Sequence, residues 1–176
     1  MERRTILKLI AAGVLPGSNG LVQLARAQDD YSPEFFSKSQ IRLIDALTEV
    51  IIPTDDHSPG AQAAMVARYI DVTVADGGRQ TQRTWRDGLK AVSKSAKKRF
   101  KKNFARCDAE QQDAVVAEMA RNEGDPATDL ERFFAVLKRA TLDGYYTSKV
   151  GIHEDLNYQG NSALADFPGC THPEHA

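Results

Sequence analysis

Apolar residues recur every three or four positions in five successive segments, and this spacing constrains the fold more than any other feature of the chain. It is the period of an amphipathic α-helix, whereas the alternating pattern of a half-buried strand is scarce. Helices are therefore expected over about residues 40–52, 59–76, 81–104, 109–123 and 129–143. We predict an all-α fold, with a single small helical domain of about five helices and a long irregular C-terminal tail.

Capping residues set the expected helix ends. Thr128 with Glu131 has the spacing of a capping box, and Asp108 with Gln111 resembles one. The residues expected at helix starts are Ser39, Ser58, Asp108 and Thr128, and those expected at helix ends are Pro53, Gly77, Gly124 and Gly144. The periodicity stops after the last of these, and residues 144–176 contain many Gly, Pro and Tyr. Because this stretch keeps many bulky apolar groups, we expect it to be ordered and to dock partly on a partner.

The N-terminus has the three parts of a secretory signal. Arg3 and Arg4 precede a modestly apolar stretch, and Ala25 and Ala27 form a small-x-small cleavage site. Paired arginines of this kind are typical of the twin-arginine (Tat) route, which carries folded proteins. We therefore expect residues 1–27 to be a Tat signal peptide, residues 28–176 to be the mature domain, and the protein to be periplasmic.

The charge balance excludes one class of function. The chain has 23 Lys and Arg against 24 Asp and Glu, and the predicted signal takes more basic than acidic residues with it. A general nucleic-acid binder carries a basic surplus instead, so we expect no nucleic-acid partner. The one strong basic run, residues 97–102, is interpreted as a solvated helix face, with contact to an acidic partner or to anionic lipid as the alternative.

The two cysteines, Cys107 and Cys170, are an even number in a chain expected to reach an oxidising compartment, which favours a disulfide over two free thiols. Cys170 also lies close to His172 and His175, and these three side chains are types that bind zinc. The spacing is not that of a standard zinc site, so we expect no metal in this chain.

Other polar clusters favour turns over chemistry. Residues 55–57 (Asp-Asp-His) and 153–155 (His-Glu-Asp) could bind a metal or move protons, but Asp and Ser before a helix more often form caps and turns. The chain has no Gly-rich nucleotide-binding turn, no G-x-S-x-G, no H-E-x-x-H and no C-x-x-C. We predict no catalytic residue and no cofactor-binding residue.

Several short motifs together resemble a known family. They are EVIIPTDDHSPGA (49–61), ARYID (67–71), GYYTSKVGI (144–152), DLNYQGN (155–161) and PGCTHPEH (168–175). In this order they resemble the small subunit, called subunit 3 or gamma, of gluconate 2-dehydrogenase-type complexes. The resemblance spans nearly the whole mature chain and includes the Tat signal.

This resemblance implies that the chain is a non-catalytic subunit. In such complexes a large flavoprotein of the glucose-methanol-choline type holds FAD and oxidises a sugar, sugar acid or polyol. A multihaem cytochrome c subunit carries haem c and passes the electrons on at the membrane. The small subunit helps the flavoprotein to mature and to cross the membrane through the Tat translocase, so the protein is expected at the outer face of the inner membrane through its complex.

Tyrosine is a favoured interface residue, which suggests where the tail meets its partner. The residues predicted to form the partner interface are Tyr145, Tyr146, Asp155, Tyr158 and Asn161. The alternative for each tyrosine is packing of the tail on its own helices. The alternative function, of another class, is a stand-alone exported metal-binding protein that uses the C-terminal Cys/His cluster.

Overall fold

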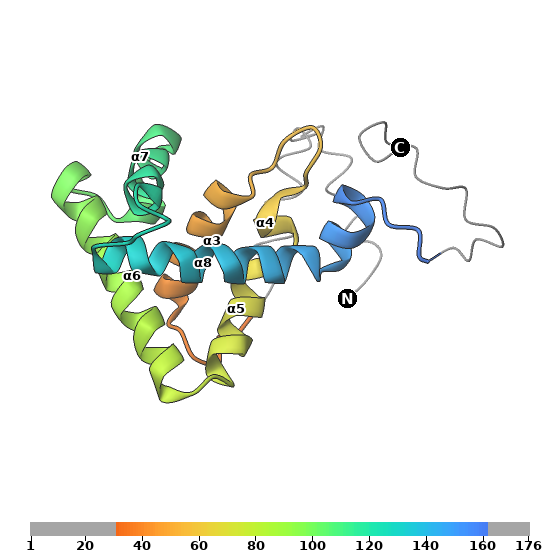
Figure 1. Ribbon diagram of the computed structural model, residues 1–176, viewed down its shortest axis with the longest axis horizontal. Coiled ribbons are helices and arrows are strands. Elements are labelled where there is room, and N and C mark those ends of the chain that lie inside the picture. The colour runs from red at the N-terminus through yellow and green to blue at the C-terminus, as the bar shows by residue number, and fades with distance from the viewer. Residues whose placement is uncertain (1–30, 162–176) are drawn as a thin grey trace, which may run out of the picture. The chain divides into compact units, whose positions relative to one another are not determined.

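The computed structural model describes residues 31–161 of the chain. The chain divides into two units, Met1–Ser32 and Pro33–Ala176, and the described part of the second is helical, with no strand among its residues. Its elements are α3 (Lys38–Ile51), α4 (Gly60–Ala63), α5 (Val66–Ala75), α6 (Arg79–Phe100), the short 3-10 helix η1 (Phe104–Arg106), α7 (Ala109–Ala120), α8 (Asp129–Tyr146) and the π-helical turn η2 (Val150–Asp155) (Figure 1). The predicted all-α fold with five principal helices is confirmed.

Helix α8 is the element on which the others assemble. It packs against α3, α5, α6 and α7, and it crosses the middle of the view in Figure 1. At its N-terminal half, Phe133 meets Trp85 of α6 edge to face, with ring centroids 5.3 Å apart. Trp85 in turn meets Phe36, so three buried aromatic rings join the chain before α3 to α6 and α8. Burial of these large rings is a main source of stability for a domain of this size.

The helix ends follow the capping rules in some places and depart from them in others. Asp108 and Thr128 accept hydrogen bonds from the amides of Gln111 and Glu131, as predicted. The N-cap of α3 is Ser37 and not Ser39, and Ser37 forms a complete capping box with Gln40. Helix α7 ends at Ala120, so the predicted end at Gly124 is wrong.

The expected helix over residues 59–76 is in fact two helices. Met65 has a left-handed backbone, with φ of 55°, which breaks the chain between α4 and α5. Pro59, and not Ser58, is the cap residue of α4, although Ser58 Oγ accepts a hydrogen bond from the Gly60 amide at 3.2 Å. The apolar period continues across the break, which is why the sequence pattern did not separate the two helices.

The predicted start of the irregular tail, at residue 144, is too early in the sequence. Helix α8 continues through Gly144 to Tyr146, and η2 follows after three residues. Gly144 therefore does not end the helix; side chains of α5 lie close to it instead. Residues 156–161 have no helical structure, and residues 162–176 lie outside the described part of the chain.

Asp71 holds the chain at the point where it enters the domain. Its buried carboxylate accepts hydrogen bonds from the amides of Glu34, Phe35 and Phe36, at 2.6, 3.1 and 2.8 Å. Across residues 31–161, none of the helices combines the length and the apolar character needed to cross a membrane.

Candidate functional site: the motif surface

The loop between α3 and α4 is a rigid turn built on two carboxylates. Asp55 accepts hydrogen bonds from the amides of Ser58 and His57, at 2.7 and 2.8 Å. Those two hydrogen bonds, the Ser58 bond first, hold the pKa of Asp55 below its usual value. Glu49 accepts from the Thr54 amide and hydroxyl with one oxygen and from the Gln62 amide with the other. The turn interpretation of residues 55–57 is confirmed.

This loop is tied to the C-terminal end of α8. Ser58 Oγ and the Tyr145 hydroxyl share a buried hydrogen bond of 2.8 Å. His57 Nε2 lies 3.4 Å from Asp155 Oδ1, which joins the same loop to the end of η2. The burial of Tyr145 raises the pKa of its phenol, so the ring is a neutral hydrogen-bonding group over the physiological range.

Two glycines allow close approaches at the same end of α8. A Cβ at Gly144 would lie 2.6 Å from Cδ1 of Tyr69, so the ring of Tyr69 occupies the space beside the bare backbone of α8. A Cβ at Gly151 would overlap the carbonyl oxygen of Tyr145, so η2 can fold back on α8 only with glycine there. Four of the motifs that carry the family resemblance therefore meet in one place. We call the exposed residues of segments 49–61, 67–71, 144–152 and 155–161 the motif surface.

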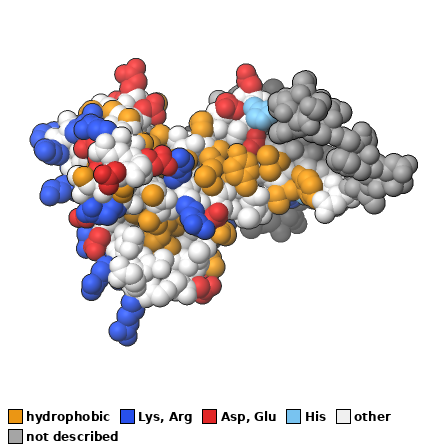
Figure 2. All heavy atoms as spheres, in the orientation of Figure 1, with side chains coloured by type: hydrophobic (Ala, Val, Ile, Leu, Met, Phe, Trp, Pro, Cys, Tyr) orange, Lys and Arg blue, Asp and Glu red, His pale blue; other side chains and the backbone are white. Residues whose placement is uncertain are grey.

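The exposed large apolar side chains gather on the motif surface and directly beside it. The large apolar side chains that are exposed among the described residues are Met65, Tyr69, Val72, Leu142, Tyr146, Leu156 and Tyr158. All of them lie in residues 65–72 or 142–158, on α5, on the end of α8 or after it. Figure 2 shows hydrophobic side chains gathered over the C-terminal half of α8 and toward η2. Clustered exposure of this kind marks an interaction surface.

The predicted interface residues fall into two groups. Tyr146 and Tyr158 are exposed, at 41% and 46%, and the Tyr158 hydroxyl donates a 2.5 Å hydrogen bond to exposed Asn161. Tyr145 is fully buried, so its prediction as a partner contact is corrected: it packs the end of α8 on its own domain. Asp155 has only 9% of its side chain exposed and holds His57. Tyr69 and Leu156 belong to the surface and were not predicted, because α-helical period alone places Tyr69 on the buried stripe of α5.

The cysteine and metal predictions fall mainly outside the described residues. Cys107 is buried and has no disulfide partner among the described residues; its thiol donates to the Asn103 carbonyl at 3.6 Å, and burial raises the pKa of that thiol. Cys170, His172 and His175 lie beyond residue 161, as Arg3, Arg4, Ala25 and Ala27 lie before residue 31, so the disulfide, the metal cluster and the export signal stay predictions. Among residues 31–161, no group of three or more His, Cys, Asp or Glu could hold a metal ion.

The described residues thus form a helical domain whose recognisable motifs meet on one surface with exposed aromatic rings, and clustered exposure of this kind is typical of interaction sites. The chain belongs to the gluconate 2-dehydrogenase subunit 3 family, whose match covers residues 38–168. It is therefore related to a subunit of a multisubunit oxidoreductase complex. No curated protein and no solved structure matches the chain significantly.

Proposed function

We propose that this protein is the non-catalytic small subunit of a periplasmic, FAD-dependent sugar or sugar-acid dehydrogenase complex, and that the motif surface docks on the large flavoprotein subunit. The observation that carries the proposal is the convergence of four family motifs on one surface that also holds the exposed aromatic rings. The family membership supports the complex, since the family is named for its third subunit.

In the proposed complex, the partner subunits hold the cofactors and carry out the redox chemistry. FAD belongs to the large subunit of the glucose-methanol-choline type and haem c to a cytochrome subunit. Maturation and export of the flavoprotein are the proposed contribution of this chain, whose twin arginines would carry both proteins through the Tat translocase. A folded, loaded flavoprotein without a signal of its own needs such a route.

Purification of the C-terminally tagged chain from its native host tests the complex. We expect a large subunit to co-purify and to give the visible absorption of flavin, with haem bands where the cytochrome is retained. A colourless chain recovered alone under gentle conditions would contradict the proposal.

Substitution on the motif surface tests the docking itself. Tyr146→Ala with Tyr158→Ala removes two exposed rings, and we expect at least a tenfold lower yield of the large subunit, since exposed tyrosines are frequent hot spots. Gln80→Ala with Thr81→Ala is the control, because both side chains are exposed on α6 and lie outside the four motifs and the cluster of exposed apolar residues. Equal yields from the double variant and the control would show that the surface is not the docking site.

Export is tested at the twin arginines. Replacement of Arg3 and Arg4 by lysine keeps the charge but removes the expected Tat signal. We expect both this chain and the flavoprotein to stay in the cytoplasm of the variant strain. Normal export of the flavoprotein in that strain would show that it does not depend on this signal.

A further inference from the structure

Helix α6 carries a straight line of positive charge along its solvent face. Its 22 residues contain eight Lys or Arg and one acid, Asp87. Seven cations recur at spacings of three or four, so at 100° per residue they lie on one face, opposite the stripe of Trp85, Leu89 and Val92. This basic row consists of Arg79, Arg83, Arg86, Lys90, Lys94, Lys97 and the C-cap residue Lys101. At 1.5 Å per residue it is about 33 Å long.

The side chains of the basic row are exposed to solvent, and few of their charges are neutralised by a carboxylate. Within the described residues its one ion pair to a carboxylate joins Lys90 to Asp87, at 3.4 Å, and both side chains are well exposed. Arg86 lies over the ring of Phe35, a contact that keeps its charge. The acids on α7 and before it pair with Arg99 and Lys102, which stand beside the row and not in it. Lys and Arg side chains follow the α6 edge in Figure 2.

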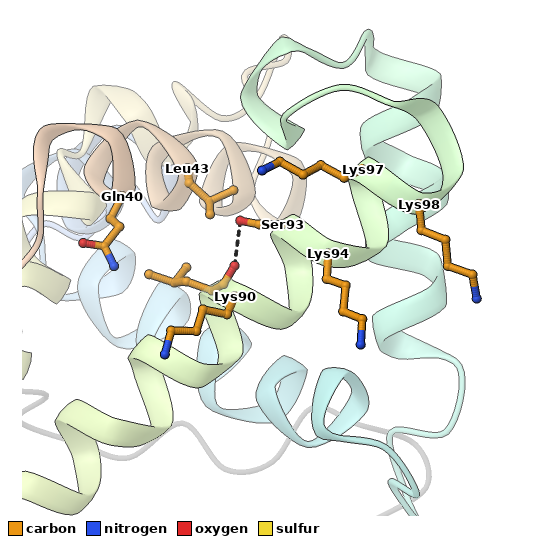
Figure 3. Close-up of a pocket in the computed structure, with 8 residues that line it drawn as sticks. Gln40, Leu43, Lys90, Ser93, Lys94, Lys97 and Lys98 are labelled. Atoms are coloured by element: carbon orange, nitrogen blue, oxygen red, sulfur yellow. Dashed lines mark hydrogen bonds between the residues drawn. The ribbon is translucent and has the colours of Figure 1, made fainter.

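Three shallow hollows follow one another along the basic row. The largest, of about 600 Å³, lies between α3 and α6 over Leu43 and Leu89, with four lysines around it. In Figure 3, Lys97 reaches toward Leu43, whereas Lys94 and Lys98 extend away from it. The other two hollows, of about 440 and 490 Å³, are lined mainly by cations at the two ends of the row. The surface therefore offers several cation-lined hollows in a line and no single deep site.

A basic surface of this kind can bind an acidic protein or an anionic lipid bilayer, and the composition of the row favours one of them. Protein interfaces are enriched in aromatic side chains and arginine and depleted in lysine. The basic row has four lysines beside three arginines, and the exposed large apolar side chains of the described residues all lie elsewhere, on the motif surface or beside it. Flexible lysines without an apolar anchor instead suit a fluid array of anionic headgroups, which attracts basic clusters near its surface.

We propose that the basic row binds the surface of a bilayer rich in anionic phospholipid. The chain as a whole has a net charge of −1, so its remaining surface is acidic and is repelled by the same bilayer. This asymmetry gives the bound protein one orientation, with α6 toward the lipid. Helix α6 meets α8 at Phe133, about 20 Å along α8 from Tyr146, so the motif surface stays free for a protein partner.

Vesicle binding tests this proposal with the purified full chain, in the absence of any partner, so its result is independent of the proposed complex. We expect the chain to sediment with phosphatidylglycerol vesicles, to bind phosphatidylcholine vesicles much less, and to be released from the former by high salt. Each basic residue near an anionic surface is worth about a fivefold change in partitioning. Lys94→Gln with Lys97→Gln should therefore weaken binding about twenty-five-fold.

A second double variant is the matched control. Arg139→Gln with Lys149→Gln removes the same charge from exposed positions on and after α8, and we expect little loss of vesicle binding. No preference for phosphatidylglycerol, or equal losses in both variants, would overturn the proposal. Unchanged lipid binding together with loss of the co-purifying large subunit in the Lys94/Lys97 variant would also overturn it and would make the row a protein contact.

Discussion

Asp71 is a buried carboxylate with a structural task. It accepts three backbone amides from residues 34–36, next to the buried ring of Phe36. An asparagine there offers one acceptor oxygen and turns a donor toward an amide. We expect Asp71→Asn to lower the free energy of unfolding by about 2–3 kcal/mol, since hydrogen bonds to charged groups are strong and a stranded donor is costly.

Urea unfolding followed by fluorescence of the single tryptophan measures this effect, because Trp85 contacts Phe36. Asp76→Asn is the control, since Asp76 is exposed at the end of α5, and a change below about 0.5 kcal/mol is expected there. A similar small change for Asp71→Asn would show that the hydrogen bonds of the Asp71 carboxylate contribute little to stability.

The two cysteines can be tested directly. If Cys107 and Cys170 form the predicted disulfide, the protein purified from the periplasm will take up no thiol label when it is denatured without reductant, and two labels after reduction. Cys107 is buried with a raised pKa, so denaturation is needed to expose it. Two labels without reductant would show free thiols.

At the scale of elements, the start of α8 depends on an ionised Glu131. Its carboxylate accepts from the amides of Thr128 and Ala127, both at 2.9 Å, and from the Asn122 side chain at 2.8 Å. These hydrogen bonds, that of the Thr128 amide first, lower the pKa of Glu131. A pKa lower in the folded than in the unfolded state stabilises the protein above the unfolded value of about 4.3, and this stabilisation is lost as the pH falls through the folded pKa.

We therefore expect Glu131→Gln to be less stable than the wild type at neutral pH and the difference to shrink on acidification. Chemical unfolding at neutral pH and at about pH 3 measures it. Glu110→Gln is the control, because Glu110 is exposed in the first turn of α7. A difference independent of pH would mean that the charge of Glu131 is not what stabilises the helix start.

The crossing of α5 and α8 depends on Gly144 and Tyr69. Alanine is favoured over glycine in a helix by about 1 kcal/mol, but the new methyl group would collide with the Tyr69 ring. We expect Gly144→Ala to destabilise the protein by about 1–2 kcal/mol because overpacking outweighs propensity. In a Tyr69→Ala background the same change should be less harmful by at least about 1 kcal/mol.

Thermal unfolding of the four proteins of this cycle gives the coupling. Additive effects of the two substitutions would show that the ring does not determine the need for glycine at this position.

The sequence predicts a helix boundary well where neighbouring residues determine it, and poorly where a residue far away in the sequence determines it. The N-cap hydrogen bonds of Asp108 and Thr128 are local, and both helix starts were predicted. Gly144 was interpreted as a helix end because glycine usually ends helices, yet its role is set by Tyr69, far away in the sequence. The break at Met65 and the burial of Tyr145 also depend on tertiary contacts, which a local sequence pattern does not contain.

At the scale of the whole molecule, two surfaces of different character lie near opposite ends of α8. The motif surface holds exposed aromatic rings and gathers at the C-terminal end of α8, while the basic row follows α6, which packs on the N-terminal half of α8. The interface residues Tyr146 and Tyr158 could be proposed from composition, because tyrosines in an aperiodic tail are unusual. The basic row was visible only as the run at residues 97–102, since its remaining members are spread over the length of α6.

This separation predicts that the two surfaces act independently. The Tyr146/Tyr158 double variant should lose the large subunit but keep its preference for phosphatidylglycerol vesicles, and the Lys94/Lys97 double variant should do the reverse. The quadruple variant should show both losses, each within about twofold of its value alone, because distant sites contribute additively. Measurement of co-purification and vesicle partitioning on the same four proteins checks this. A loss of lipid binding in the tyrosine variant would mean that the aromatic rings also enter the bilayer, and the motif surface would then be a membrane contact in addition to a docking site.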